Sequence, residues 1–258
     1  MEIGIFFVGI FAGILSGLFG IGGGIVMVPI LIAFFGMGML DANATSLAAM
    51  LLPVGVFGVI SYYKAGFINV KESLWISLGL FGGSFVGAEL AVSVDVSLLS
   101  KLYAVFLLYV VISFFDIPSL ISRFRNTPPP SKTTKQIQRS VLNLILLGVF
   151  AGVIAGMFGK GGGIIIVPIL IKFFGYNTKA ATATSLAALQ LPVGLPSVII
   201  YGQDGHLNLA LAALMALGLV IGVFVGSKMA LKISSKYFKK VYAVFLLGVA
   251  VYMVVKYI

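Results

Sequence analysis

The amino-acid sequence predicts an all-α, polytopic membrane protein built from two homologous halves that form an inverted repeat. Three observations lead to this fold class: a very apolar composition, an internal duplication and a one-sided distribution of basic residues. Of the 258 residues, 60% are apolar and 9% are charged, and the mean hydropathy is +1.18. Soluble domains carry about 25% charged residues and could not bury so much apolar surface at this length. The chain must therefore use lipid as its solvent.

The duplication is visible as two long repeated segments. GLFGIGGGIVMVPILIAFFG at 17–36 returns as GMFGKGGGIIIVPILIKFFG at 156–175, and ATSLAAMLLPVG at 44–55 returns as ATSLAALQLPVG at 183–194. Both pairs share one offset, so the halves align without a gap. We predict three regions: a first membrane repeat at 1–121, a basic, proline-rich cytoplasmic linker at 122–140, and a second membrane repeat at 141–258.

Each half contains five apolar runs, which in the first half cover about residues 3–19, 25–35, 45–63, 73–92 and 99–120. A spanning helix needs about 20 residues, so the last three runs are expected to span and the second is too short. Three consecutive glycines separate the first two runs, and each costs a helix about 1 kcal/mol relative to alanine. The first two runs should therefore form either a re-entrant pair or two spans around a mid-membrane turn. Either arrangement gives each half an odd number of crossings.

The basic residues test this parity. With the linker inside and an odd number of crossings per half, every basic residue except Lys101, Lys160 and Lys256 falls on or near the inner side. This is the distribution that the positive-inside rule expects, whereas even parity would divide the basic residues between the two sides. Odd parity inverts the halves relative to each other, as in many secondary transporters. The net charge of +10 is then a topology signal, and we expect no nucleic-acid partner.

Small residues and prolines predict how the helices pack. Glycines at four-residue spacing let helix backbones approach closely, and two such series occur: Gly79, Gly83 and Gly87, and Gly218, Gly222 and Gly226. Pro53 and Pro192 lie within apolar runs, where each removes a backbone hydrogen bond and is expected to kink its helix.

The glycine tracts are the first candidates for a binding site. Short helices beginning after Gly24 and Gly163 would point their N-termini, with partial positive charge and unpaired N–H groups, at the membrane interior. Two such ends near the midplane of an inverted repeat would form a cradle for an anion. Lys160 replaces an isoleucine of the first tract and would add a positive charge there. The alternative is that Lys160 lies near a membrane surface and extends into water.

Polar residues within the apolar runs extend this candidate site. These residues are Asn43, Thr45, Ser46, Thr182, Thr184 and Ser185. The Ser and Thr hydroxyls could donate to anion oxygens, or they could cap the following helices. Gln190, opposite Leu51 in the alignment of the halves, fits a pocket lining or an interhelical hydrogen bond. Glu89 could carry a proton for coupled transport, although its place near the end of its run also fits a solvated position.

The residues needed for other chemistries are scarce. Cysteine is absent, and His206 is the single histidine and is expected to be a solvated loop residue. No nucleophile with a partner base and no zinc-binding set is present. We therefore predict no enzyme activity, no metal and no cofactor. A pore is harder to separate from a carrier, so an anion channel stays an alternative.

The duplicated motif GxxxGxFGxGGGxxxVPxL followed by ATSL resembles the TauE/SafE sulfite-exporter family, and the resemblance covers both halves. It implies a multi-pass protein of a prokaryotic inner membrane that exports sulfite, sulfoacetate or other organosulfonates. The inverted repeat and the GKGGG tract favour alternating access around a central site at the interface of the halves. Transport would be secondary, coupled to protons or sodium, and the resemblance leaves a homodimer open. We predict a substrate site that comprises Gly22, Gly23, Gly24, Asn43, Thr45, Ser46, Lys160, Gly161, Gly162, Gly163, Thr182, Thr184, Ser185 and Gln190.

Overall fold

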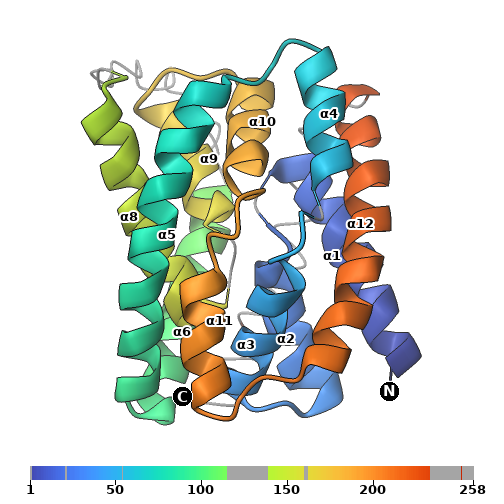
Figure 1. The fold of residues 1–258 in the computed structure, drawn as a ribbon, viewed down its shortest axis with the longest axis vertical. Helices are drawn as coiled ribbons and strands as arrows, with labels where there is room; N and C mark the ends of the chain where they lie inside the picture. The colour runs from blue at the N-terminus through green and yellow to red at the C-terminus, as the bar shows by residue number, and fades with distance from the viewer. Residues whose placement is uncertain are drawn as a thin grey trace, which may run out of the picture.

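The computed structural model describes residues 2–20, 22–53, 55–114, 139–159, 162–232 and 251. Over these ranges the chain is helical and contains no β-strand. The helices (Figure 1) are α1 (Glu2–Phe19), α2 (Gly24–Phe35), α3 (Met39–Ala49), α4 (Val56–Lys64), α5 (Val70–Ser93), α6 (Val96–Phe114), α8 (Val141–Phe158), α9 (Gly163–Lys172), α10 (Thr178–Ala188), α11 (Leu195–Gln203) and α12 (Leu209–Lys232). Among the described helices α1, α5, α8 and α12 are long and apolar enough to cross a membrane. The predicted all-α polytopic fold is confirmed.

The series α8 to α12 repeats the series α1 to α5, with corresponding bounds in the two halves. The predicted glycine break separates α1 from α2 and α8 from α9. The linker prediction falls, up to residue 138, outside the described residues, as do Ile21, Lys160 and Gly161.

The prolines break their helices instead of kinking them, so one prediction is wrong. The run expected as a single span at 45–63 is divided into α3, which ends at Ala49, and α4, which begins at Val56. Proline lacks the backbone N–H and disfavours helical backbone in the residue before it. A glycine then forms the N-cap of the next helix, Gly55 in the first half and Gly194 in the second. Each half thus contains two short half-helices in line, α3 with α4 and α10 with α11 (Figure 1).

Two glycine seams join the halves along their long helices. The predicted spacing of small residues is confirmed: the glycines of α5 pack on the backbone of α8, and those of α12 pack on the backbone of α1. At Gly83 an added Cβ would overlap the carbonyl oxygen of Val149, and at Gly222 it would overlap that of Ile10. Both seams pair a helix of the first half with one of the second, so the halves interlock and share one core.

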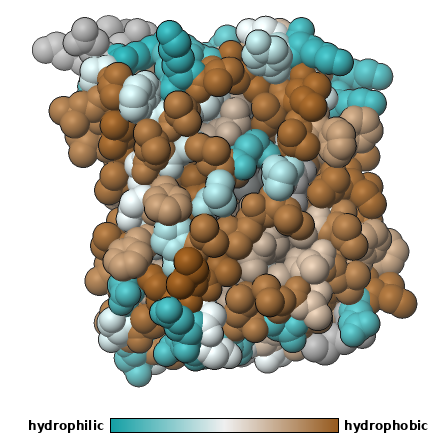
Figure 2. Space-filling view, in the orientation of Figure 1, coloured by the Kyte–Doolittle hydropathy of each residue, from teal (hydrophilic) through white to brown (hydrophobic). Residues whose placement is uncertain are grey.

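Charged residues separate to the two ends of the helix bundle. In Figure 1 the end of α4, the start of α5, the end of α9, the start of α10 and the end of α12 lie at the top. These positions carry Lys64, Lys71, Lys172, Lys179 and Lys232. The start of α3 and the loop after α11 lie at the bottom and carry acidic residues. Figure 2 shows hydrophilic rims at both ends and a mainly hydrophobic band between them, as expected for a protein that crosses a bilayer.

Candidate substrate site

The glycine breaks are sharp turns inside the bundle. α1 ends at Phe19, and Gly20 and Gly22 follow with positive φ angles of 63° and 72°. Gly159 repeats this geometry after α8, with φ 65°. Residues other than glycine rarely adopt this conformation, which explains why glycine stands here in both halves. Gly23 and Gly162 then form the N-caps of α2 and α9.

The repeated ATS segment of each half holds the glycine break of the other half. The Ser46 hydroxyl on α3 donates to the carbonyl oxygen of Gly159 at 2.5 Å. Its counterpart on α10, the Ser185 hydroxyl, donates to the carbonyl oxygen of Gly20 at 2.7 Å. Asn43 Nδ2 likewise donates to the Met157 carbonyl at 3.0 Å. These side chains satisfy carbonyls that a helix C-terminus leaves without intrahelical donors.

The N-capping interpretation of the two serines is therefore wrong. Ser46 and Ser185 lie inside α3 and α10, whose N-caps are Gly38 and Asn177. Thr182 also lies inside α10, where its hydroxyl donates to the Phe19 carbonyl at 3.4 Å. The serines of the two ATS segments cap helix C-termini, and they do so across the two halves.

Two threonine hydroxyls differ from this pattern. Thr45 and Thr184 occupy corresponding positions in the two halves, and both side chains are fully buried. Neither Oγ1 has a hydrogen-bond partner among the residues that the structure describes, and the same is true of Asn43 Oδ1. Buried polar atoms are almost always hydrogen-bonded, so these three atoms are candidates for contact with a ligand or water.

A small cleft of about 30 Å³ lies beside the break of the second half. It is formed where α3, α5, α8 and the interruption between α10 and α11 meet, and it is lined by Leu47, Met50, Leu80, Ser84, Ala155, Gly162, Leu189, Val193 and Gly194. Non-helical backbone at membrane depth must line a cavity or be buried in protein. Figure 2 accordingly shows hydrophilic surface within the hydrophobic band, in the region of these interruptions.

The N-terminus of α9 borders this cleft. Gly162 lines the cleft, and the first intrahelical donors of α9 are the N–H groups of Ile165 and Ile166, which donate to the Gly162 carbonyl. The N–H groups of Gly163 and Ile164 thus have no acceptor within the helix. A helix N-terminus of this kind attracts an anion.

The remaining predicted residues lie in mixed surroundings. Gln190 Nε2 donates to the Leu186 carbonyl within its own segment at 2.8 Å, and its Oε1 has no partner in the described part of the chain. Glu89 is exposed on α5 near the helix end, and a proton-coupling role for it stays a prediction. Gly22, Gly23 and Gly24 are buried at the other break.

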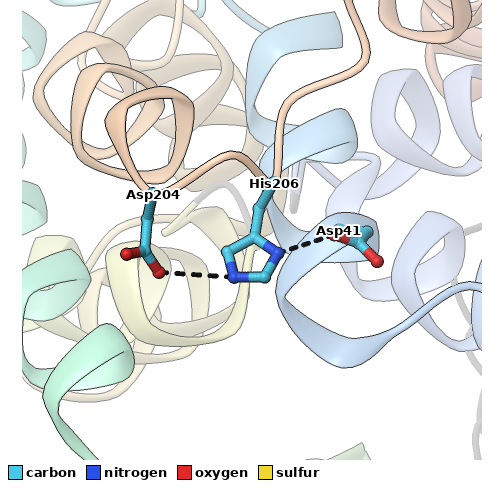
Figure 3. A network of polar contacts seen from close by, with 3 residues as sticks. All are labelled: Asp41, Asp204 and His206. Atoms are coloured by element: carbon cyan, nitrogen blue, oxygen red, sulfur yellow. Dashed lines mark hydrogen bonds and ion pairs between the residues drawn. The ribbon is translucent and has the colours of Figure 1, made fainter.

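Sequence reasoning missed two sets of residues. The hydroxyls of Tyr62 and Tyr201 donate to the carbonyls of Gly17 and Gly156, at 3.1 and 2.9 Å. Both tyrosines recur at the repeat offset, a signal that could have identified them. The other set, His206 with Asp41 and Asp204 (Figure 3), has no counterpart in the first half.

Comparisons with known proteins agree with this architecture. The family model described as "Sulfite exporter TauE/SafE" matches residues 5–253. A "Probable membrane transporter protein" of Methanocaldococcus jannaschii is 30% identical over 90% of this chain and 87% of its own length. "Probable membrane transporter protein YunE" of Bacillus subtilis is 27% identical over 88% and 86%, and a protein of Xylella fastidiosa with the same general name is 25% identical over 94% and 90%. No solved structure matches the chain.

Proposed function

Because the chain belongs to the sulfite exporter TauE/SafE family of membrane transporters, we propose that it exports a small sulfur-containing anion such as sulfite, sulfoacetate or another organosulfonate. The observation that carries this proposal is the N-terminus of α9, which opens into a cleft between the two halves. A sulfonate or sulfite group presents oxygen acceptors to its free N–H groups. Lys160, immediately before this glycine tract, adds positive charge.

The transport mechanism we propose is alternating access in an inverted repeat. It is supported by the positions of the first helices in Figure 1, where α1 begins near the lower end and α8 at the upper end. The first helix of each half packs against the last long helix of the other half: α1 against α12, and α8 against α5. The end rich in lysine would face the cytoplasm, together with the linker at 122–140, and the membrane would be a prokaryotic inner membrane.

Anion binding is tested by thermal unfolding of the purified protein with a panel of sulfur anions. A ligand that binds the native state raises the unfolding midpoint. We expect sulfite or a sulfonate to do so, and we expect Lys160→Ala to lose the response. Lys172→Ala is the matched control, because Lys172 is exposed at the other end of α9. Stabilisation by an amine or a neutral solute instead of any sulfur anion would contradict the substrate proposal.

Transport in proteoliposomes separates the carrier from the channel. A carrier gives a flux that saturates with concentration and is accelerated by substrate on the opposite side. A channel gives a conductance that does not saturate in this way. We expect saturation and counterflow with a sulfonate, and their absence alongside a large anion conductance would favour the channel.

Thr45 and Thr184, whose hydroxyls have no described hydrogen-bond partner, give a second prediction. Thr184→Val removes a hydroxyl that has no described partner, so the free energy of unfolding should stay within about 0.5 kcal/mol of its original value or rise. If the hydroxyl binds substrate, transport should fall about tenfold, the effect of one lost hydrogen bond to an anion. The matched control is Thr182→Val, which removes a hydroxyl that is bonded to Phe19 and should lower stability. Unchanged transport by Thr184→Val would remove this residue from the site.

A further inference from the structure

The single histidine of the chain lies between two carboxylates at the acidic end of the bundle (Figure 3). His206 Nδ1 is 2.7 Å from Asp41 Oδ1, and His206 Nε2 is 3.3 Å from Asp204 Oδ2. Asp41 is in the first turn of α3, whereas Asp204 and His206 are in the loop between α11 and α12. The imidazole therefore ties the second half to the first.

The number of hydrogen bonds that His206 donates to the two carboxylates depends on whether its imidazole is protonated. A neutral imidazole carries a single N–H, so it can donate to one carboxylate only; the imidazolium donates from both nitrogens. Adding one proton to the neutral ring changes the charge of the three side chains from −2 (two carboxylates) to −1 and supplies the second donor. Protonation thus strengthens the tie between α3 and the loop after α11.

The same two helices reach the cleft. Leu47 of α3 and Gly194, the N-cap of α11, line it, while the opposite ends of α3 and α11 meet at His206. Leu47 lies six residues beyond Asp41, which corresponds to about 9 Å along a helix. α3 and α11 pack against each other and come from different halves. Both helices thus extend from the cleft to the His206 cluster.

The other end of the bundle is closed differently. The residue corresponding to His206 is Phe67, which packs with Tyr62, Ala183 and Leu186 in a small apolar cluster. Ala65 and Ala180 stand where Asp204 and Asp41 stand in the other half. The imidazole and its two carboxylates thus have apolar counterparts at the other end, where Lys179 Nζ lies 5.7 Å from the centroid of the Phe67 ring.

We propose that Asp41, Asp204 and His206 form the binding site for a coupling proton, and that the bound proton holds α3 and α11 together and closes this end of the cleft. The proposal rests on the proposed alternating-access function and supplies its coupling ion.

Few other described groups that titrate or carry charge face this cluster. α3 has no other titratable residue, and on α11 the Tyr201 hydroxyl is bonded to Gly156. On α12, Lys228 and Lys232 are in the last turns, at the opposite end. On α5 and α6, Glu89 and Lys101 are exposed, and Asp95 accepts hydrogen bonds from the N–H groups of Ser97 and Leu98.

Because the chain contains no cysteine, a single introduced cysteine would be its only thiol and can be labelled selectively. Met50→Cys places a thiol in the cleft wall. An impermeant maleimide is added to membrane vesicles from the side on which Asp41 lies. Labelling is measured at about pH 5 and at about pH 8, because histidine changes charge between these values. Each rate is divided by that of the same protein denatured at the same pH, because the thiolate fraction rises with pH. We expect labelling to be about tenfold faster at the higher pH, as one hydrogen bond to a charged group is lost.

Two substitutions in this background should abolish the pH dependence in opposite ways. His206→Gln is neutral and should label rapidly at both pH values, whereas His206→Arg is always charged with several donors and should label slowly at both. Asp41→Asn should behave like His206→Gln, and Asp95→Asn is the matched control that should keep the pH response. A rate independent of pH in the Met50→Cys protein, or a pH response that survives in His206→Gln, would overturn the proposal.

Sulfonate flux, measured on the same variants, separates this proposal from the proposed function. A sulfonate keeps its charge over this pH range, so its own titration does not interfere. Flux that is driven by a pH gradient and lost in His206→Gln supports both proposals. Flux that is unaffected by a pH gradient overturns proton coupling alone. A pH-dependent labelling rate without any sulfonate flux supports the proton-controlled closure and rejects the substrate.

Discussion

Gly83→Ala should lower the thermal unfolding midpoint of the protein by on the order of 5 °C, while Gly82→Ala should leave it unchanged or raise it. A Cβ at Gly83 would overlap backbone atoms of Val149 on α8, whereas a Cβ at Gly82 would meet nothing within 4 Å. Backbone cannot rotate away as a side chain can, so α5 and α8 would have to separate. Overpacking of this kind typically costs about 1–3 kcal/mol.

The comparison of adjacent glycines removes the effect of helix propensity. Both substitutions gain about 1 kcal/mol because alanine favours the helix over glycine, so the difference between the variants reports the steric contact alone. Unfolding is followed by the loss of monodisperse protein in detergent on heating. Equal midpoints for the two variants would mean that the seam can widen without loss of stability.

The seams, the glycine breaks and the fold class could all be predicted from the sequence, because each depends on local pattern. Four-residue glycine spacing indicates close helix contact, and three glycines in a row end a helix. What the pattern could not provide was the partner of each seam. That α5 packs on α8, and not on a helix of its own half, depends on the arrangement of the whole chain.

The chemistry of the candidate site was less predictable for the same reason. Ser46 and Thr45 are adjacent in the sequence, yet one hydroxyl holds the break of the other half and the neighbouring one has no described partner. Residue type could not distinguish these roles, since both hydroxyls are equally able to donate. His206 was expected to be solvated because it lies in a loop. Its contact with Asp41 could not be foreseen, since Asp41 is remote in sequence.

Positions that are identical in the two halves differ in role from positions at which the halves differ. Where the halves agree, as in Ser46 with Ser185 and Tyr62 with Tyr201, the residues hold the helix breaks. Where they differ, as in His206 against Phe67, one half has an imidazole between two carboxylates and the other has a phenyl ring in a small apolar cluster. Departures from the repeat are therefore the places where we look for substrate and ion specificity, and Lys160 is another such departure.

Ser46→Ala and Ser185→Ala should each lower the free energy of unfolding by about 1–3 kcal/mol and reduce transport about tenfold or more. Each serine is fully buried and donates to a break carbonyl of the opposite half. Alanine fits the same space but leaves that buried carbonyl without this donor. The break also positions the N-terminus of the following helix, so the transport rate should fall by more than stability alone would require.

Ser61→Ala is the matched control for both variants. The Ser61 hydroxyl donates to the Phe57 carbonyl one turn earlier on the same helix, at 2.8 Å, and this carbonyl keeps its helical N–H donor when the hydroxyl is removed. Its unfolding midpoint and transport rate should therefore stay close to those of the unmodified protein. If Ser46→Ala matched Ser61→Ala in both measurements, the glycine break would be held by its own backbone geometry. If Ser46→Ala lost transport at unchanged stability, the hydroxyl would act on the substrate path and not on the fold.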